Sequence, residues 1–257
     1  MFRWIADLHV HTLLSPCADI EMTPRNIIRQ ASGHGINLVA ITDHNVSANV
    51  PAALQLGQEY DVTVWPGVEV ETSEGGHVVV LFDGLRKLAA FQAILDQNMN
   101  GLKNDPVKLG AQFVVDEQDE LIKEEDRLLL AAVKLNLHTL TAQARELGGL
   151  CVAAHIDRPA YSMLSYLGFL PQDAGFAAVE ISKTALSDQK IKKYTALSGG
   201  LPYITSSDAH TMDEFITGAK THIYMEEPTI KEFSLALAGI DGRRVEAGQF
   251  SVQYRQD

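Results

Sequence analysis

Short runs of β-branched and aliphatic residues alternate along this chain with segments that carry helix-boundary residues, and this alternation strongly restricts the fold. The expected strands cover residues 3–6, 38–41, 62–65, 78–81, 150–153, 178–181, 203–205 and 222–225. The expected helices cover residues 24–33, 51–59, 85–97, 139–147, 188–197 and 229–238. In the first helix, Thr23 is a suitable N-cap, Pro24 suits the first helical position and Gly33 can end the helix. Repeated strand–helix alternation predicts an α/β protein with a mostly parallel sheet.

The length and composition fit one large globular domain. The chain has 257 residues, of which 46% are hydrophobic and 21% are charged, so it can bury a single core of barrel size. We therefore expect one domain over residues 1–257. Residues from about 98 to 126 break the alternation and contain two charge runs, 116–120 and 123–126. We interpret this stretch as a helical, acidic insertion that faces solvent, because charge runs usually form exposed surfaces.

Charge and cysteine content exclude several classes of protein. With 33 acidic against 21 basic residues, the net charge is −12, which disfavours extended nucleic-acid binding and favours a small phosphorylated substrate. The two cysteines are too few for a disulfide scaffold. No apolar stretch of about 18 residues and no signal-peptide pattern occurs. We expect a cytoplasmic protein without a membrane segment.

Histidines and carboxylates follow the expected strands in a regular pattern. His9 and His11 are two residues apart on a strand, so both imidazoles can reach one metal ion. Asp208 and His210 repeat this spacing after a later strand. The carboxyl ends of the strands of an α/β barrel meet at one mouth, where residues far apart in sequence converge.

Four further residues lie at or near strand ends: His44, Glu69 and His155 follow apolar runs, whereas His77 precedes its run. A single histidine at such a place is usually structural, but an ordered set of this kind predicts a metal site. Imidazole and carboxylate ligands suit zinc, manganese or iron, and so large a set suits two or three divalent ions. Such a cluster can activate water and stabilise an in-line displacement at phosphorus.

Other polar residues have weaker patterns. His34, His138 and His222 are interpreted as structural. Arg158 and Lys183 follow strands and are candidates to bind phosphoryl oxygens. Solvation of both side chains, or an ion pair of the arginine with the adjacent aspartate, is about equally compatible with the sequence.

Five motifs resemble those of the polymerase-and-histidinol-phosphatase (PHP) family. They are Asp7–Thr12, Ile41–His44, Gly67–Glu69, Ala154–His155 and Ser207–His210. The resemblance covers nearly the whole chain, and it implies a distorted (β/α)7 barrel with a metal site at the carboxyl ends of the strands.

The resemblance also implies three ligand sets. The first ion would be held by His9, His11, Glu69 and Asp208. The second would be held by Glu69, His77 and His155, and the third by His44 and His210. Asp43 would orient His44 or another ligand from behind.

The chain departs from the family pattern after Ser15. Many family members have an aspartate at the next position or a histidine one residue later, where this chain has Pro16 and Cys17. The Cys17 thiolate, Asp19 or Glu21 could complete the third site, and we favour a carboxylate, Asp19, because oxygen ligands match the rest of the set.

These residues predict a metal-dependent phosphoesterase that hydrolyses a small phosphate ester, such as a nucleotide or a phosphorylated metabolite, with metal-activated hydroxide. One alternative is an exonuclease-like phosphodiesterase that acts on oligonucleotide ends. Another is a non-catalytic metal-binding regulatory module, since fold alone does not guarantee activity. The sequence does not choose between the three metals, and it does not define the oligomeric state.

Overall fold

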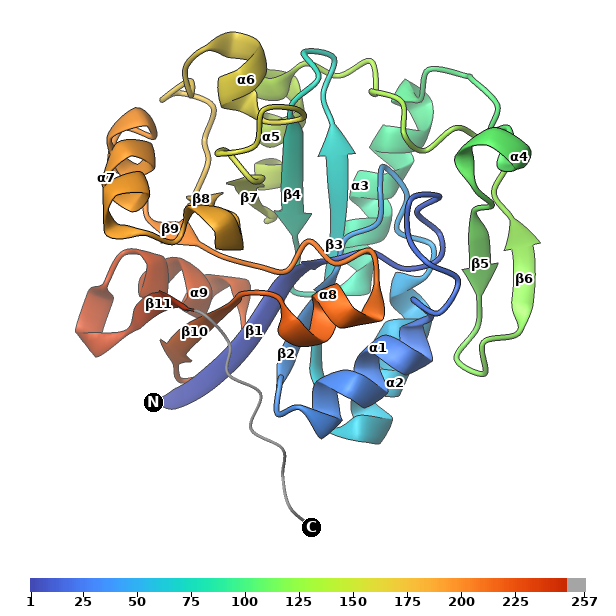
Figure 1. The fold of residues 1–257 in the computed structure, drawn as a ribbon, viewed down its shortest axis with the longest axis horizontal. Helices are drawn as coiled ribbons and strands as arrows, with labels where there is room; N and C mark the ends of the chain where they lie inside the picture. The colour runs from blue at the N-terminus through green and yellow to red at the C-terminus, as the bar shows by residue number, and fades with distance from the viewer. Residues whose placement is uncertain (249–257) are drawn as a thin grey trace.

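The computed structural model describes residues 1–248, apart from the side chain of Asp188, and in that range nine strands form one nearly closed barrel-shaped sheet (Figure 1). In sheet order the strands are β11 (Arg244–Gly248), β10 (Lys220–Met225), β1 (Phe2–Val10), β2 (Leu38–Ile41), β3 (Thr63–Glu71), β4 (His77–Leu81), β7 (Leu150–Ala153), β8 (Ala178–Glu180) and β9 (Tyr203–Ile204). The two outer strands, β9 and β11, contact each other. The expected α/β barrel is confirmed.

Most strands run in one direction, as the alternation predicts, but two are reversed. Strand β4 is antiparallel to both β3 and β7, and β10 is antiparallel to both β1 and β11. The other neighbouring strands pair in parallel. The amino-terminal end of β4 therefore lies at the same end of the barrel as the carboxyl ends of its neighbours β3 and β7.

Buried apolar residues line both faces of the sheet. In β2, Leu38 and Ala40 belong to one cluster and Val39 and Ile41 to another, because successive side chains of a strand point to opposite faces. The larger cluster includes side chains of the helices packed outside the sheet. These helices are α1 (Pro24–Gly33), α2 (Val50–Tyr60), α3 (Leu85–Asn98), α5 (Leu137–Glu146) and α8 (Met212–Thr217). The smaller cluster includes α9 (Ile230–Leu237).

The first helix has the boundaries that its sequence predicts. The side chain of Thr23 accepts a hydrogen bond from the backbone N–H of Asn26, and Pro24 occupies the first helical position. The helix ends at Gly33. Its capped start fixes the end of the long loop that leaves β1, and this loop forms part of the mouth of the barrel.

A buried ion pair joins β1 to β10. The Lys220 ammonium lies 3.0 Å from Asp7 Oδ2, and both side chains are fully buried. The ammonium also donates hydrogen bonds to the backbone carbonyls of Phe215 and Gly218. Asp7 Oδ1 accepts a hydrogen bond from the backbone N–H of Ser207. The pair therefore anchors the segment that follows β9.

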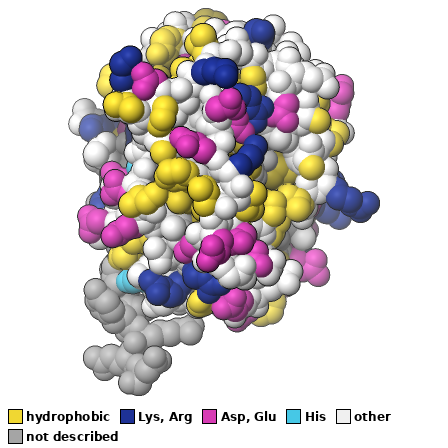
Figure 2. Space-filling model, turned by 90° about the vertical axis from the view of Figure 1, so that its right-hand side faces the viewer, with side chains coloured by type: hydrophobic (Ala, Val, Ile, Leu, Met, Phe, Trp, Pro, Cys, Tyr) yellow, Lys and Arg dark blue, Asp and Glu magenta, His cyan; other side chains and the backbone are white. Residues whose placement is uncertain are grey.

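The stretch that we interpreted as a helical, acidic insertion contains one short helix, α4 (Pro106–Leu109), and a hairpin of β5 (Phe113–Val115) and β6 (Leu121–Glu124). Asn49 fastens the hairpin: its side chain donates to the carbonyl of Phe113 and accepts from the N–H of Val115. On this side of the molecule, exposed apolar side chains lie among acidic and basic ones (Figure 2).

The remaining helical elements are α6 (Met163–Leu167), η1 (Lys183–Ala185), α7 (Asp188–Leu197) and η2 (Ile240–Gly242). Elements α6 and η1 follow β7 and β8, so they lie near the mouth of the barrel; α6 is labelled in Figure 1. None of the helices formed by residues 1–248 has the length and apolar character needed to cross a bilayer.

Candidate metal centre

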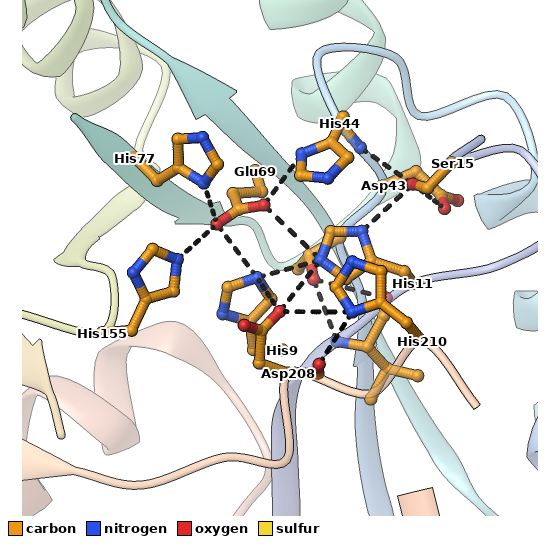
Figure 3. Close-up of polar contacts among 12 residues, drawn as sticks. His9, His11, Ser15, Asp43, His44, Glu69, His77, His155, Asp208 and His210 are labelled. Atoms are coloured by element: carbon orange, nitrogen blue, oxygen red, sulfur yellow. Dashed lines mark hydrogen bonds and ion pairs between the residues drawn. The ribbon is translucent and has the colours of Figure 1, made fainter. Parts of the chain in front are cut away.

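The eight histidines and carboxylates that both the spacing and the family resemblance select come together at the mouth of the barrel (Figure 3). They are His9, His11, His44, Glu69, His77, His155, Asp208 and His210. Seven of them are buried, and His210 is half-buried. The cluster therefore has little access to bulk water on most of its sides.

The reversed direction of β4 explains the position of His77. This histidine is the first residue of its strand, whereas Glu69 lies near the end of the preceding strand. Because the two strands are antiparallel, both residues lie at the mouth. His77 precedes its apolar run, unlike the other ligand candidates, because β4 runs in the opposite direction to β3.

Glu69 lies at the centre of the cluster. Its Oε1 is 2.7 Å from His77 Nδ1, 3.1 Å from His155 Nε2 and 3.2 Å from His9 Nε2. Its Oε2 is 3.0 Å from His44 Nδ1, without the alignment of a hydrogen bond. A carboxylate surrounded in this way can bridge neighbouring cations.

Four atoms have the spacing of one coordination shell. His9 Nε2 lies 3.2 Å from His11 Nε2, and the two nitrogens lie 3.3 and 3.2 Å from Asp208 Oδ1. Glu69 Oε1 is 3.2 Å from His9 Nε2. Two ligands of a tetrahedral ion with bonds of about 2.1 Å lie about 3.4 Å apart. The spacing and the donor types therefore fit a divalent transition ion held by these residues.

Two ligand candidates lie in strained backbone conformations. His155 has φ of 30° and Asp208 has φ of 50°, values that residues other than glycine seldom adopt. In addition, His155 Nδ1 is buried and has no hydrogen-bond partner among residues 1–248. Strain and unsatisfied polar atoms of this kind concentrate at functional sites.

Glu180 supports His9 from behind and was not predicted as a site residue. Its carboxylate oxygens lie 3.1 and 3.3 Å from His9 Nδ1. A histidine whose Nδ1–H donates to a carboxylate presents Nε2 for a metal, and such partners raise ligand basicity. Its sequence signal is a buried carboxylate at the end of an otherwise apolar strand, β8.

Asp43 supports His11 through a serine. Its carboxylate accepts hydrogen bonds from the N–H and hydroxyl of Thr12, each 2.7 Å, and from Ser15 Oγ, 2.8 Å. Burial raises the pKa of Asp43, although these hydrogen bonds oppose the increase. Ser15 Oγ also lies 3.0 Å from His11 Nδ1. The chain of contacts leaves His11 Nε2 directed at the cluster.

A third group of ligand atoms comes from His11, His44 and His210, which each offer one nitrogen within 4.8 Å of the others. The Cys17 thiol lines the same cavity wall as His44 and His210. Partial burial raises the pKa of this thiol, but its interactions with His210 and His44 outweigh burial and lower the pKa to about 6. Burial lowers the pKa of His44, whereas its interactions with Cys17 and with the Glu69 carboxylate raise it to about 10.

The loop after Ser15 does not place the expected carboxylates at the cluster. Asp19 and Glu21 are exposed and do not line the cavity over the cluster, whereas Cys17 does. The backbone N–H of Asp19 bonds to the carbonyl of His210, and this contact fixes the loop beside the cluster. The structure thus brings Cys17, and not Asp19, to the third group.

A cavity of about 260 Å³ opens over the cluster, and its wall includes Arg158, Tyr161 and Leu130 besides the ligand candidates. Arg158 Nη1 lies 2.5 Å from Asp208 Oδ2. Among the described contacts, this arginine pairs with Asp208 and not with the adjacent Asp157, whose carboxylate accepts from the N–H of Ser182. Arg158 therefore lies at the cluster of ligand candidates.

Lys183 lies beside this cavity. Its Nζ donates to the carbonyl of Thr217 over 2.9 Å, and it lines a neighbouring cavity together with Arg158. His34, His138 and His222 lie outside the cluster, in or next to α1, in α5 and in β10. His34 Nδ1 lies 2.8 Å from the carbonyl oxygen of Gln30 in α1.

A family comparison identifies residues 7–199 as a PHP domain. An uncharacterised protein of Methanocaldococcus jannaschii is 39% identical over 85 residues, which cover 30% of this chain and 49% of that protein. A phosphoribosyl 1,2-cyclic phosphate 1,2-diphosphodiesterase of Eggerthella lenta is 38% identical over 66 residues, which cover 26% of this chain and 24% of that protein. A 5'-3' exoribonuclease of Haemophilus influenzae is 31% identical over 78 residues, which cover 29% of this chain and 27% of that protein. The alignments thus span about half or less of these relatives.

Solved structures share the fold at low sequence identity. The lesion-specific endonuclease Q of Pyrococcus furiosus superimposes with a TM-score of 0.65 at 20% identity, over 95% of this chain and 58% of that one. An amidohydrolase of Chromobacterium violaceum superimposes with a TM-score of 0.57 at 20% identity, over 90% of this chain and 96% of that one. Its structure was solved with bound sulfate and no metal. At this identity the likeness concerns the fold alone.

Proposed function

Because the chain belongs to the PHP domain family, we propose that it is a metal-dependent phosphoesterase that hydrolyses a small phosphate ester. The observation that carries the proposal is the spacing of the ligand atoms of His9, His11 and Asp208, which lie 3.2 to 3.3 Å apart in a buried cluster. Nitrogen and oxygen atoms at these separations fit the coordination shell of zinc, manganese or iron.

In this proposal three sets of residues hold two or three divalent ions. The first set is His9, His11, Glu69 and Asp208, the second is Glu69, His77 and His155, and the third is His44, His210 and Cys17. When bound, such ions lower the pKa of water and neutralise charge on a phosphoryl group. No side chain of the chain has to act as a covalent nucleophile.

The protein side chains have distinct roles around the reacting phosphate. Arg158 reaches the cluster and keeps several N–H donors besides the one that faces Asp208, so it binds phosphoryl oxygens. Glu180 holds the proton of His9 on Nδ1, and Asp43 holds Ser15 against His11. Both carboxylates act as positioning residues that fix imidazole orientation.

Several observations support a small ester. The cavity over the cluster has a volume of about 260 Å³, and a net charge of −12 opposes the approach of an extended polyanion. The nuclease alternative draws support from the Haemophilus exoribonuclease, which is 31% identical to this chain over 78 residues. An oligonucleotide end could enter this cavity, whereas a long strand would meet repulsion outside it.

The direct test combines metal analysis with hydrolysis of a generic aryl phosphate. We expect more than one equivalent of transition metal per chain and metal-dependent hydrolysis. His155→Ala should lower both the metal content and the rate, whereas His138→Ala, an exposed histidine of α5, should change neither. One equivalent or less after reconstitution, or equal losses in the two variants, would contradict the multinuclear site.

Kinetics on two substrates separate the small-ester and nuclease functions. We expect a mononucleotide to have a higher kcat/KM than a single-stranded oligonucleotide of the same base composition at low salt. Added salt should narrow this gap, because screening weakens the repulsion of the polymer. Faster hydrolysis of the oligonucleotide at low salt would favour the nuclease.

A further inference from the structure

A second cavity lies directly beside the metal centre. It has a volume of about 180 Å³ and is lined by Arg158, Glu180, Ser182, Lys183, Thr184, Ser206, Ser207 and Asp208. Two of these residues, Arg158 and Asp208, also line the cavity over the metal cluster. The two cavities therefore share a wall. The lining residues come from the ends of β7, β8 and β9 or from the segments that follow them, at the mouth of the barrel.

Two hydroxyl groups in this cavity have no hydrogen-bond partner in the part of the chain that the structure describes. Ser206 is 3% exposed, and its hydroxyl has no hydrogen-bond partner among residues 1–248. The hydroxyl of the neighbouring Ser207 is also buried and has none in that range. A buried polar group without a partner costs about 1–3 kcal/mol. The cavity thus presents donors that a ligand can satisfy.

The same cavity contains two cations with free donor capacity. Lys183 uses one of the three N–H groups of its ammonium on the Thr217 carbonyl. Arg158 uses its Nη1 on Asp208 and has further N–H groups. Ser182 and Thr184 line the same wall, but their hydroxyls already have partners: Ser182 Oγ donates to the Asp157 carboxylate and lies 2.9 Å from Thr184 Oγ1. The Lys183 ammonium, the Arg158 guanidinium and the hydroxyls of Ser206 and Ser207 form a suitable donor set for a tetrahedral oxyanion.

The carboxylates in the wall already have partners, so they oppose an anion less than free carboxylates would. Both oxygens of Glu180 face His9 Nδ1, at 3.1 and 3.3 Å. One oxygen of Asp208 faces Arg158, and the other faces His9 and His11. The cavity volume corresponds to the share of about six water molecules in the liquid, which leaves room for a phosphoryl group.

We propose that this second cavity binds a phosphoryl group of the substrate that is not hydrolysed. The inference rests on the proposed function, in which the reacting phosphate lies over the metal cluster. The preferred substrate then carries two phosphoryl groups, one in each cavity, with Arg158 between them. The second phosphate can belong to a small bisphosphate or to the next position of a dinucleotide.

The test measures binding without turnover. We would titrate the metal-loaded protein by calorimetry with alkane bisphosphonates of increasing chain length and with the matching alkyl monophosphonates. One bisphosphonate length should bind at least about tenfold more tightly than its monophosphonate, because the second group gains hydrogen bonds to charged donors. Lys183→Met and Ser206→Ala should each reduce this advantage. Lys192→Met, which removes an exposed lysine outside the cavity wall, should preserve it.

The outcomes separate this inference from the proposed function. Equal affinity for the two phosphonate classes at every length would overturn the second phosphate site, even if the protein hydrolyses aryl phosphate. A bisphosphonate advantage that depends on Lys183 and Ser206 supports the site, even if no ester tested is hydrolysed. An advantage that survives both substitutions overturns the assignment to this cavity.

Kinetic measurements with different substrates then identify the molecule that supplies the second phosphate. We expect kcat/KM for a nucleoside bisphosphate or a 5'-phosphorylated dinucleotide to exceed that for the nucleoside monophosphate. Lys183→Met should lower the ratio of these two kcat/KM values, whereas Lys192→Met should leave the ratio unchanged. A preference for the dinucleotide alone would assign the second phosphate to a nucleic-acid end, and a preference for the small bisphosphate would assign it to a metabolite. A monophosphate preference would contradict the inference.

Discussion

Replacement of Lys220 by methionine should destabilise the protein strongly. Methionine nearly preserves the length of the side chain, but the change removes a buried cation 3.0 Å from Asp7 Oδ2. It also leaves the carbonyls of Phe215 and Gly218 without this donor. Removal of one partner of a buried ion pair costs about 3–5 kcal/mol, because the other charge stays buried without compensation. For a chain of this size, the loss corresponds to a fall in Tm of about 6–20 °C.

The assay is chemical and thermal unfolding followed by circular dichroism at a fixed metal load. Lys231→Met, which removes an exposed lysine of α9, is the matched control and should change the free energy of unfolding by less than about 0.5 kcal/mol. Adding Asp7→Asn to Lys220→Met should restore part of the loss, since it removes the uncompensated charge. A Lys220→Met protein as stable as the control would refute this reasoning, as would a double variant that is less stable than the single one.

Three further predictions concern the ligands and one acidic side chain. Cys17→Ser should lower metal stoichiometry and abolish a thiolate charge-transfer band in the cobalt-substituted protein; an unchanged spectrum would show that the thiol is not a ligand. Glu180→Gln should weaken metal affinity by about 10–100-fold, because the partner of His9 Nδ1 loses its charge; equal affinity in a metal-buffered titration would contradict this role. Hydrogen bonds from Arg127 outweigh burial and hold the pKa of Glu125 at about 2, below its ordinary value of 4.5. Its ionised form therefore contributes stability that is fully present above pH 4.5 and is lost as the pH falls towards 2. The stability deficit of Glu125→Gln should accordingly shrink over that range in acid unfolding curves, and a constant deficit would count against the assignment.

The sequence predicts the barrel well because its signals are local. Apolar runs and helix boundaries such as Thr23 and Pro24 identify the elements without knowledge of the rest of the chain. Strand direction is different, because an apolar run looks the same whether a strand is parallel or reversed. For this reason His77 does not fit the pattern in the sequence, and only the antiparallel pairing of β3 and β4 explains it. The same limit applies to residues 98–126, which form a hairpin in addition to the short helix α4.

The ligand candidates could be named because histidines are rare and their spacing is regular. Their supporting residues could not, since their roles depend on partners far away in sequence. Glu180 lies 171 positions from His9, and nothing near it in the chain indicates that histidine. The choice between Cys17 and Asp19 likewise depends on how one loop turns towards His44 and His210. Loop conformation of this kind follows from tertiary contacts that a one-dimensional pattern does not contain.

The reversed strand β4 also has a consequence for the order in which the centre assembles during folding. Glu69 and His77 are eight residues apart and belong to one hairpin, so the loop that joins them costs little entropy to close. His9 and Asp208 come from opposite ends of the chain and meet only when β9 has joined the sheet. We therefore expect the hairpin ligands to form early and the shell around His9 to close last. Local opening of the segment after β9 would then release one ion while the hairpin keeps its ligand pair.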